Sequence, residues 1–384
     1  MKRVRQSKNK VVIVLPTYNE AGNIKTVIDQ IIKTSRLIDN WQIQILVVDD
    51  YSPDKTAQIV TKLKETRPQL YLVTGKKQGL GKAYTRGFKY ATNQMRAKVI
   101  FEMDADLSHP AKLIPRMLKS IDNGADFVIG ARYIKGGAIP KDWGLHRKAF
   151  SFFGNLIIQL GFMNFKVHDW TSGFRAIKAD FIEAVLPEMS KYSGYVFQIA
   201  LLDKAIKKDL IIKEVPLKFK DRQKGVSKIN SIEFIFYIFA YIFHHSSFIK
   251  YVLVGFVGAT IDFIAAYILI ARFSIYKPLA NAFSAELAII FNFFVNNFWS
   301  FAYKQIQGGW TVWLVKFLLF NLVAFGSVII QFVGMYLALK WFGDTIFNVL
   351  GYAIQSWLVY KVFIIGFLVI PYSYFMYNRV IWKK

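Results

Sequence analysis

Short apolar runs recur along the first part of the chain. Val11–Leu15 is apolar throughout and is followed by Pro16, and Ile43–Val48 is a second such run, in which Gln44 is the one polar residue. Near-continuous apolar runs of this length are typical of parallel strands that are covered on both faces of a sheet. The pattern predicts buried strands over these two segments and over three further runs: Leu70–Val73, Val99–Met103 and Phe127–Ile129.

Helical spacing of apolar residues separates these runs. It predicts helices over Ile24–Ile38, Thr56–Thr66 and Ala83–Met95, the first of them beginning near Asn19–Gly22. Strands that alternate with helices predict an α/β domain with a mostly parallel sheet and helices on both faces. Ligands bind at the carboxyl ends of the strands in such sheets. Polar clusters follow three of the predicted strands, so we expect a ligand site there: Pro16–Glu20, Asp49–Asp54 and Asp104–His109.

The last third of the chain is dominated by long apolar runs. A bilayer core of about 30 Å needs about 20 helical residues. Four segments meet this requirement and predict an all-α membrane domain: Phe248–Phe273, Leu279–Tyr303, Val312–Leu339 and Val359–Tyr377. Ile346–Leu358 is a further apolar stretch, which we interpret either as the start of one long tilted helix or as a short re-entrant piece.

Ser231–Phe243 is apolar almost all round but too short to span a bilayer. We predict a helix over 231–246 that lies at the membrane interface, because the membrane segments begin directly after it. The alternative is a helix packed inside the preceding domain. The predicted organisation is therefore a soluble domain over 1–230, an amphipathic interfacial helix and linker over 231–247, and a four-span membrane domain over 248–384.

The charge is strongly basic, at +25 over 384 residues. Ten of the 50 Lys and Arg residues and three of the 25 Asp and Glu residues lie after Ser247, which leaves 40 basic and 22 acidic side chains in the first 247 residues. The chain has neither zinc-ligand spacing nor an aromatic RNA-binding pattern, so nucleic acid is not the expected partner. A membrane surface and phosphate-bearing substrates are the expected partners of the basic excess. Cysteine is absent, which excludes disulfides, thiol catalysis and thiolate metal sites.

The charge distribution also bears on sidedness. Val11–Leu15 is too short for a signal peptide, so we expect the soluble domain on the cytoplasmic side of the cell membrane. Four spans put both ends of the membrane domain on one side, and Lys304, Lys316 and the basic C-terminus agree with that side being cytoplasmic. Three bases would then lie outside and oppose it: Arg272, Lys277 and Lys340.

Asp104 and Asp106 directly follow a predicted strand. In that setting their carboxylates can converge on one hard cation, Mg²⁺ or Mn²⁺, with diphosphate oxygens and water as the remaining ligands. The metal would neutralise a diphosphate leaving group. The alternative is two solvated loop acids, and the Asp-x-Asp pattern does not decide between them.

The other polar clusters have two readings each. Tyr18 and Glu20 offer a ring for stacking and an acceptor for ribose hydroxyls, or simply a helix entry capped by Asn19. Asp49–Asp54 offers acceptors for a base edge, or a turn. Gly79–Ala83 is interpreted as a glycine turn into a helix, with Lys82 near phosphate. Taken singly, six spaced bases are expected to be solvated surface residues: Arg132, Arg147, Arg175, Arg222, Lys224 and Lys228.

Residues 1–230 resemble the dolichyl-phosphate (polyprenyl-phosphate) mannosyltransferases, which are inverting family-2 glycosyltransferases with a GT-A fold. Tyr51 departs from the family pattern, which has Asp or Asn there, and Trp170-Thr171 replaces its usual Pro-Val or Ile-Thr. Eight ordered segments carry the resemblance: VLPTYNE at 14–20, VVDDYSPD at 47–54, GLGKAYTRGF at 79–88, MDADLSHP at 103–110, GARYIKGG at 130–137, TSGFRA at 171–176, GYVFQI at 194–199 and EVPLKFKDRQKGVSK at 214–228.

The resemblance implies a role for each matching position. Asp104 and Asp106 would hold the metal, with Ser108 as an extra ligand and the Ala105 backbone on the nucleotide. Asp169 would position the sugar or the reacting phosphate. The nucleoside would be held by five residues: Pro16, Tyr18, Glu20, Val48 and Asp50. Diphosphate or acceptor phosphate would be held by Arg132, Arg222 and Lys228, and the acceptor phosphate also by Arg147 and Ser151.

The activity implied is transfer of mannose from GDP-mannose to a membrane polyprenyl phosphate with inversion. A phosphate monoester has a second pKa of about 6 and needs no general base, so His109 and His168 are interpreted as structural. The alternatives are a UDP-sugar-dependent glucosyl- or N-acetylglucosaminyltransferase and a lipid-linked sugar carrier or flippase. A processive polysaccharide synthase is disfavoured because its Gln-x-x-Arg-Trp motif is absent.

Residues 248–384 resemble the GtrA-like four-span proteins, which are thought to bind or move polyprenyl-linked sugars. The segment KYVLVGFVGATIDF at 250–263 and the polar cluster Asn292–Trp299 carry this resemblance. Asp262 and Glu286 lie inside predicted spans. We expect either a role in passage of the lipid-linked sugar or simple pairing with a Lys or with one of the amides of Asn292, Asn296 and Asn297.

Overall fold

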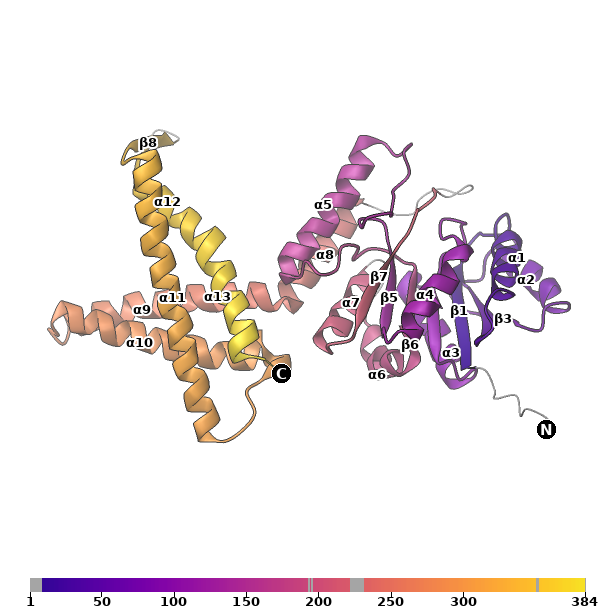
Figure 1. Cartoon of the computed structure of the whole chain (residues 1–384), viewed down its shortest axis with the longest axis horizontal. Helices are drawn as coiled ribbons and strands as arrows, with labels where there is room; N and C mark the ends of the chain where they lie inside the picture. The colour runs from indigo at the N-terminus through magenta and orange to yellow at the C-terminus, as the bar shows by residue number, and fades with distance from the viewer. Residues whose placement is uncertain (1–8, 193, 195, 222–230, 350–351, 384) are drawn as a thin grey trace. The chain divides into compact units, whose positions relative to one another are not determined.

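The computed structural model describes residues 9–192, 194, 196–221, 231–349 and 352–383 (Figure 1). The chain divides into two compact units, Met1–Tyr241 and Ile242–Lys384. The first unit is an α/β domain, and the second is almost entirely helical. Each unit is described by itself.

A seven-stranded mixed sheet forms the centre of the first unit, in the order β3-β2-β1-β4-β6-β5-β7. β6 pairs antiparallel with β4 and β5, and the other pairs are parallel. The strands are β1 (Asn9–Thr17), β2 (Trp41–Asp49), β3 (Leu70–Thr74), β4 (Val99–Glu102), β5 (Phe127–Ala131), β6 (Arg175–Lys178) and β7 (Ile212–Pro216).

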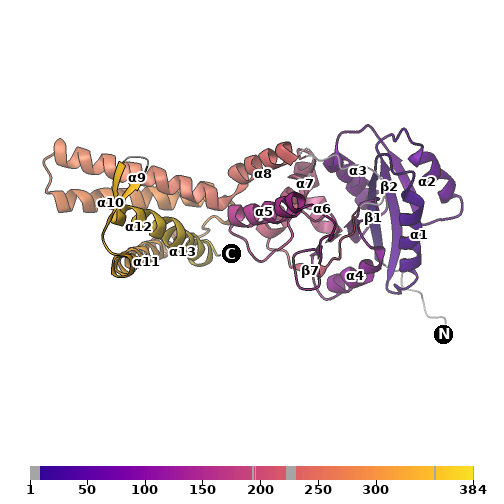
Figure 2. The ribbon, with the colours of Figure 1, turned by 90° about the horizontal axis from the view of Figure 1, so that it is seen from above.

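Helices cover both faces of this sheet (Figure 2). α1 and α4 pack on one face, with α2 beside α1, and α3 packs on the other face, with α6 and α7 beside it. The helices are α1 (Ile24–Ser35), α2 (Thr56–Lys64), α3 (Leu80–Asn93), α4 (Ile114–Asp122), α5 (Leu145–Phe162), α6 (Ala179–Met189), α7 (Val196–Lys207) and α8 (Ser231–His245).

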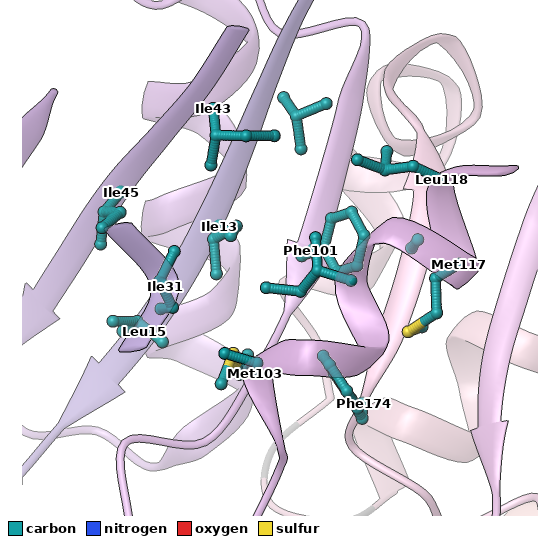
Figure 3. Packing of buried hydrophobic residues seen from close by; sticks show 14 of the residues in the cluster. Ile13, Leu15, Ile31, Ile43, Ile45, Phe101, Met103, Met117, Leu118 and Phe174 are labelled. Atoms are coloured by element: carbon teal, nitrogen blue, oxygen red, sulfur yellow. The ribbon is translucent and has the colours of Figure 1, made fainter. Parts of the chain in front are cut away.

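The two-sided cover explains the near-continuous apolar runs. Ile13 and Leu15 of β1 face α1 and α4 together with Ile45 of β2 and Phe101 of β4, and all four are fully buried (Figure 3). Full burial of such side chains contributes roughly 1.5–3 kcal/mol each. On the opposite face α3 approaches so closely that a Cβ atom at Gly87 would lie 2.5 Å from Val14 Cγ1. That contact requires glycine at this position.

The predicted strands and helices of this unit are confirmed, with shifted ends. β6 and β7 lie outside the predicted strands. α1 begins at Ile24 rather than near Asn19, because Asn19 has a left-handed backbone (φ 63°) and the chain still turns there. The predicted glycine turn into a helix is also confirmed, since Gly79 (φ 94°) directly precedes α3.

The order of the strands determines where a ligand can bind. From β1 the chain adds β2 and β3 on one side and then returns to add β4 on the other side of β1. Such a reversal opens a crevice beyond the carboxyl ends of the two central strands. The loops after β1 and β4 therefore border the crevice, and these loops carry Tyr18 and Asp104.

Within the described part of the second unit, four helical segments are long and apolar enough to cross a membrane: Ser247–Ala271, Lys277–Ser300, Trp310–Phe342 and Ser356–Ile381. They comprise α9 (Ser247–Ala271), α10 (Lys277–Val295), α11 (Trp310–Phe342), α12 (Ser356–Ile364) and α13 (Ile370–Met376), with π-helical turns at Asn296–Ser300, Ile365–Val369 and Tyr377–Ile381. These segments confirm the four predicted apolar spans.

The predicted start of a long helix over Ile346–Leu358 is wrong, whereas a re-entrant piece there stays a prediction. β8 (Ile346–Val349) and β9 (Tyr352–Gln355) form an antiparallel hairpin there, and α12 begins only at Ser356. Apolar content alone cannot separate a short strand from a helical segment, and Ile, Phe, Val and Tyr favour strands.

Asp262 and Glu286 both lie on the membrane-type helices. The Ser284 hydroxyl donates a hydrogen bond to Asp262, so the Asp262 carboxylate is paired with a hydroxyl rather than with the predicted Lys or amide partners. Asn297 Oδ1 instead accepts hydrogen bonds from the Ile306 main chain and the Trp382 indole, both at 2.9 Å.

Candidate functional site

A cavity of about 680 Å³ lies in the first unit, at the carboxyl edge of the sheet. One part of its wall is polar and carries Asp104, Asp106, Arg132 and Arg147. Another part is apolar and comes from α5 and α8: Phe150, Phe153, Ile157, Ile238 and Phe239. A cavity of this composition can receive a ligand that is charged at one end and apolar at the other.

Asp104 and Asp106 follow β4 in a tight loop. The Asp104 side chain is about one-third exposed, whereas Asp106 is nearly buried. Asp106 Oδ1 accepts hydrogen bonds from the Ser108 main-chain N–H (3.1 Å) and hydroxyl (2.6 Å). Ser108 is fully buried and its hydroxyl is directed at Asp106, so its observed contact is with a carboxylate of the loop.

His109 stabilises the loop that carries Asp104 and Asp106. Its Nδ1 accepts a hydrogen bond from the Asp104 main-chain N–H at 2.9 Å, which requires an unprotonated Nδ1. Burial lowers the pKa of His109 to about 4, so the ring is neutral at physiological pH. The ring also stacks on Phe174 with centroids 5.0 Å apart. These contacts agree with a structural His109.

The carboxylates of Asp104 and Asp106 fit a divalent cation that is bound partly by the protein and partly by a substrate. No group of three or more His, Cys, Asp or Glu side chains that could hold a metal is found among the residues that the structure describes. Asp104 and Asp106 thus offer carboxylate oxygens without a closed cage around them. Mg²⁺ is commonly bound in this way, through one or two carboxylates plus substrate phosphates and water.

Arg132 follows β5 and is held by Asp169. The Asp169 carboxylate accepts hydrogen bonds from the Arg132 main-chain N–H (2.8 Å), Nε (2.8 Å) and Nη2 (2.7 Å). Arg132 Nη2 also donates to the Thr171 hydroxyl at 2.8 Å. Arg132 lines the cavity, whereas Asp169 is fully buried and is not one of the lining residues. The observed contact of Asp169 is therefore with Arg132, which it orients.

Arg147 and Ser151 lie one turn apart on α5, and both line the cavity. The Arg147 guanidinium pairs with Asp221 (Nη1 to Oδ2, 2.9 Å) and lies over the Trp143 ring, 4.0 Å from its centroid. The Ser151 hydroxyl accepts a hydrogen bond from the Tyr133 hydroxyl at 2.5 Å. The two predicted acceptor-phosphate residues thus share one wall with Arg132.

The loops after β1 and β2 are joined to each other. Three successive main-chain N–H groups donate across the gap: Asn19 to the Ser52 hydroxyl (3.1 Å), Glu20 to the Thr56 hydroxyl (3.0 Å) and Ala21 to Asp54 Oδ2 (2.9 Å). The Lys77 ammonium lies 3.6 Å above the Tyr18 ring. The two clusters proposed for the nucleoside therefore form one surface.

The remaining predicted nucleoside residues differ in access. Asp50 is nearly buried and accepts a hydrogen bond from Arg86 at 3.0 Å; burial raises the pKa of its carboxyl group, and the Arg86 guanidinium opposes this. Val48 is fully buried, and its side chain packs at Gly87 of α3. It pairs in register with Pro16 of β1. Ala105 is also buried, between Asp104 and Asp106.

The prediction of a solvated surface residue is wrong for Arg175 and for Arg132, whose side chain is 9% exposed and bound to Asp169. Arg175 is fully buried rather than solvated, and it donates to the main-chain carbonyls of Gln198 (2.7 Å) and Trp170 (2.9 Å). The Lys82 ammonium donates to the Ser190 carbonyl at 2.5 Å at the end of α6, and Lys82 is not among the residues that line the cavity, so its place near phosphate stays a prediction. Arg222, Lys224 and Lys228 lie outside the described residues.

Buried charge continues beneath the site. Glu102, the last residue of β4, lies 3.7 Å from Arg175 Nε, and both side chains are fully buried. Burial raises the pKa of Glu102 to about 7, although the Arg175 guanidinium acts in the opposite direction. This pair links the β4 end, which leads into Asp104, to the start of α7.

Several lining residues were missed by the sequence analysis. Gln198 and Gly173 line the polar part of the cavity, and Phe219 and Asp221 follow β7. Gln198 is the one polar residue in the stretch VFQIALL at 196–202. Its neighbours at 197 and 199–202 are buried apolar residues, so a polar side chain among them could have indicated a site residue. The exposed aromatic residues Phe150 and Phe153 on α5 were a second signal.

Comparison with known proteins adds two family assignments. Residues 12–186 match the model of glycosyl transferase family 2, and residues 250–382 match that of the GtrA/DPMS transmembrane domain. The chain is 30% identical to dolichol-phosphate mannosyltransferase of Pyrococcus furiosus, over 84% of this chain and 89% of the relative. It is 34% identical to polyprenol monophosphomannose synthase of Mycolicibacterium smegmatis, over 58% of this chain and 81% of the relative.

Among solved structures, glucosyl-3-phosphoglycerate synthase of Mycobacterium tuberculosis in complex with UDP superposes with a TM-score of 0.44 and 18% identity. It covers 61% of this chain and 79% of its own. The transmembrane family match and the four apolar segments together make the chain a multi-pass membrane protein.

Proposed function

The chain belongs to glycosyl transferase family 2, with the dolichol-phosphate mannosyltransferases as its relatives, and we propose from this premise that it is a polyprenyl-phosphate mannosyltransferase. It would transfer mannose from GDP-mannose to a membrane polyprenyl phosphate and release GDP. The names of two relatives contain mannose together with a dolichol or polyprenol phosphate, and both relatives are aligned over most of their own length, which supports the transferred sugar and the acceptor.

The observation that carries the proposal is the composition of one cavity. Carboxylates suited to a metal–diphosphate (Asp104 and Asp106), guanidinium groups suited to a phosphate (Arg132 and Arg147) and an apolar wall from α5 and α8 surround the same space. A polyprenyl phosphate has this combination of a dianionic head and an apolar tail. A soluble acceptor such as a sugar would leave the aromatic residues of the apolar wall without a partner.

The residues of the polar wall then divide the work. Asp104 and Asp106 would hold a divalent cation, Mg²⁺ or Mn²⁺, whose positive charge stabilises the departing diphosphate. Asp169 fixes the Arg132 guanidinium, so this side chain is oriented before the substrate arrives and does not need to reorganise during the reaction. Arg222 and Lys228 are proposed diphosphate ligands by resemblance alone.

The acceptor needs orientation rather than deprotonation. Its phosphate is largely dianionic near neutral pH, because the second pKa is about 6. Arg147 would hold it by exchanging its contact with Asp221 for the phosphate, and Ser151 on the next turn would add a hydroxyl. In-line attack on the anomeric carbon inverts its configuration, so an α-linked donor gives a β-linked lipid phosphate.

The nucleoside would occupy the joined loops after β1 and β2. Tyr18 offers an aromatic face, and Glu20 and Asp50 offer carboxylate acceptors for ribose and base. Val48 and Pro16 can contribute through the main chain, since the Val48 side chain is packed inside. The Ala105 main chain would face the nucleotide between the two metal ligands.

The exposed apolar residues support the proposed division into 1–230, 231–247 and 248–384. On α8, Ile238 is buried while Phe236 and Phe239 are at least half exposed. We therefore keep α8 as an interfacial helix that packs on the catalytic domain with one face. The catalytic domain would lie on the cytoplasmic side, as the charges in the loops favour.

The experiment is a transfer assay with the full-length protein in detergent, a polyprenyl phosphate, Mg²⁺ or Mn²⁺, and a panel of GDP- and UDP-sugars. We expect mannosyl transfer from GDP-mannose and a β-anomer by NMR. Transfer from a UDP-sugar alone would show that the donor is a UDP-sugar rather than GDP-mannose. An α-anomer would refute the single displacement. Absence of transfer from every donor would favour the carrier function.

Arg147→Ala sharpens the test of the acceptor site. Loss of a charge-assisted hydrogen bond costs about 1.5–3 kcal/mol, so KM for polyprenyl phosphate should rise roughly 10- to 100-fold while KM for GDP-mannose stays unchanged. Arg67→Ala is the matched control, because it also removes an arginine paired with an aspartate at 2.7 Å but lies away from the cavity. An equal rise in both KM values would argue against a specific phosphate contact.

A further inference from the structure

Gln198 is a buried polar side chain in the cavity wall, and its amide lies near the Glu102 carboxyl group. It is only 2% exposed, and it lines the cavity near the start of α7. Neither Oε1 nor Nε2 has a hydrogen-bond partner of good geometry among the residues that the structure describes. Leaving such a group unsatisfied is costly in a folded protein. A ligand that supplies both an acceptor and a donor would remove that cost.

Gly173 provides the space for such a ligand. A Cβ atom placed there would lie 3.8 Å from Gln198 Nε2, 3.8 Å from Asp104 Oδ2 and 3.6 Å from His109 Cε1. The absent side chain therefore leaves a small hollow between the amide and a proposed metal ligand. Because the diphosphate would be held at Asp104, the group next to the diphosphate would fall in this hollow.

The main chain that carries the Gln198 amide is held in a fixed place. The main-chain carbonyl of Gln198 accepts a hydrogen bond from the fully buried Arg175. The neighbouring Phe197 stacks on Tyr84 of α3, with centroids 6.0 Å apart. A side-chain amide on this fixed main chain, with one donor side and one acceptor side, matches two adjacent hydroxyl groups, since each hydroxyl can both donate and accept.

From these contacts we infer that Gln198 and the hollow at Gly173 form the subsite for the transferred sugar, with the Gln198 amide bound to hydroxyl groups of a hexose. The inference rests on the proposed function, because it takes the donor to be a nucleotide diphosphate sugar. Gln198 then acts as a specificity-determining residue that reads the hydroxyl pattern of the sugar. No nucleoside contact is involved.

A purely internal role is the competing explanation. Glu102 lies close enough for the Gln198 amide to lower the pKa of its carboxyl group, so the two side chains can pair beneath the site. In that case replacing Gln198 would disturb the protein in general, whichever donor is bound. A sugar contact instead produces a loss that depends on one hydroxyl group of the donor.

The test is equilibrium binding of GDP, GDP-mannose and its monodeoxy analogues to the full-length protein in detergent with Mn²⁺, without acceptor. In the wild type, removal of the recognised hydroxyl should weaken binding about tenfold or more, because a site built to bind a hydroxyl rejects the analogue that lacks it. Gln198→Met should weaken GDP-mannose by a similar factor, leave GDP unchanged and abolish the discrimination against that deoxy analogue.

Gln44→Met is the matched control. Gln44 is 6% exposed and lies on β2, where its amide is directed at Tyr71 away from the cavity. This variant should discriminate among the analogues as the wild type does. Unchanged discrimination in Gln198→Met would overturn the inference, as would a loss of GDP binding equal to the loss of GDP-mannose binding.

Gly173→Ala tests the hollow without disturbing the amide. The added methyl group would make only ordinary contacts of 3.6–3.8 Å with the protein, so the fold should be kept. We expect GDP binding and the thermal midpoint to stay as in the wild type and GDP-mannose binding to fall at least tenfold. Wild-type affinity for GDP-mannose in this variant would overturn the subsite.

The two proposals fail differently. A wild type that binds GDP-mannose with the expected hydroxyl dependence but transfers no sugar contradicts the proposed transferase and supports the subsite. A wild type that transfers mannose but binds every deoxy analogue equally contradicts the subsite alone. Absence of any nucleotide-sugar binding contradicts both.

Discussion

Asp169→Asn tests whether the cavity arginine is held in place by a buried carboxylate. Asp169 is fully buried, and Arg132 has a side-chain exposure of 9%. Three hydrogen bonds of 2.7–2.8 Å join them. Asn has the same shape, but one oxygen becomes an NH₂ group that must face an N–H donor of Arg132. The substitution thus removes the charge and converts at least one hydrogen bond into a donor–donor contact.

The expected cost follows from the burial. Removing one partner of a buried ion pair costs about 3–5 kcal/mol, because the other charge stays buried without compensation. For a unit of this size, 1 kcal/mol corresponds to roughly 2–4 °C in the unfolding midpoint. We therefore expect a decrease of roughly 6–20 °C. Transfer should fall about 100-fold, since displacement of an orienting group by about 1 Å has that effect.

The assay is a thermal unfolding scan of the full-length protein in detergent. Transfer is measured at a temperature well below the lowered unfolding midpoint. Asp29→Asn is the matched control, because Asp29 pairs with Arg67 at 2.7 Å but is about half exposed, and such pairs contribute about 0–1 kcal/mol. If Asp169→Asn lowers the midpoint no more than Asp29→Asn does, or keeps wild-type turnover, the orienting role of Asp169 is refuted.

Three further predictions concern the strand-end loops. Tyr51 has φ 50° and is 62% exposed, so Tyr51→Asn should relieve about 1 kcal/mol of strain and raise the unfolding midpoint by a few degrees; a lower midpoint would contradict this. Burial would raise the pKa of Asp54, but hydrogen bonds from Thr56 and the Ala21 main chain outweigh this effect and lower the pKa. The Asp54 carboxylate therefore stabilises the fold above its unfolded pKa of about 4, and this stabilisation is lost as the pH falls below that value. Asp54→Asn should therefore flatten the decline of the midpoint in that acid range, and an unchanged slope would contradict it. Chelation by EDTA should abolish transfer, which Mg²⁺ or Mn²⁺ restores in the wild type but not in Asp104→Ala; full activity in EDTA would rule out the metal at Asp104 and Asp106.

The sequence was most informative where both faces of an element are buried. Val11–Leu15 can be apolar throughout, and Ile43–Val48 apolar except for Gln44, only because helices cover the sheet on both sides, so periodicity and length sufficed to identify them. β6 (Arg175–Lys178) carries an arginine and a lysine and gives no such signal. It pairs antiparallel between β4 and β5, and that insertion depends on contacts distant in sequence.

The site was predictable where its residues follow strands directly. Asp104 and Asp106 come after β4 and Arg132 comes after β5, so a parallel sheet alone brings them to one edge. The partners of these residues were not predictable. Asp169 reaches Arg132 across 37 residues, and Arg147 reaches Asp221 across 74, and no local pattern encodes either pair. The family resemblance gave roles to Asp169, Arg132 and Arg147, but it did not predict which residues they contact.

Arg175 shows why single charges mislead. In sequence it is one of several spaced bases, and exposure is the usual state of an arginine. In the structure it is fully buried, and its guanidinium binds two main-chain carbonyls while Glu102 lies 3.7 Å away. A buried guanidinium with compensating acceptors fixes the chain around it, here at the end of β4 and the start of α7. The same residue thus connects the metal loop to Gln198, so the proposed diphosphate and sugar positions are set by one buried contact network rather than by two independent loops.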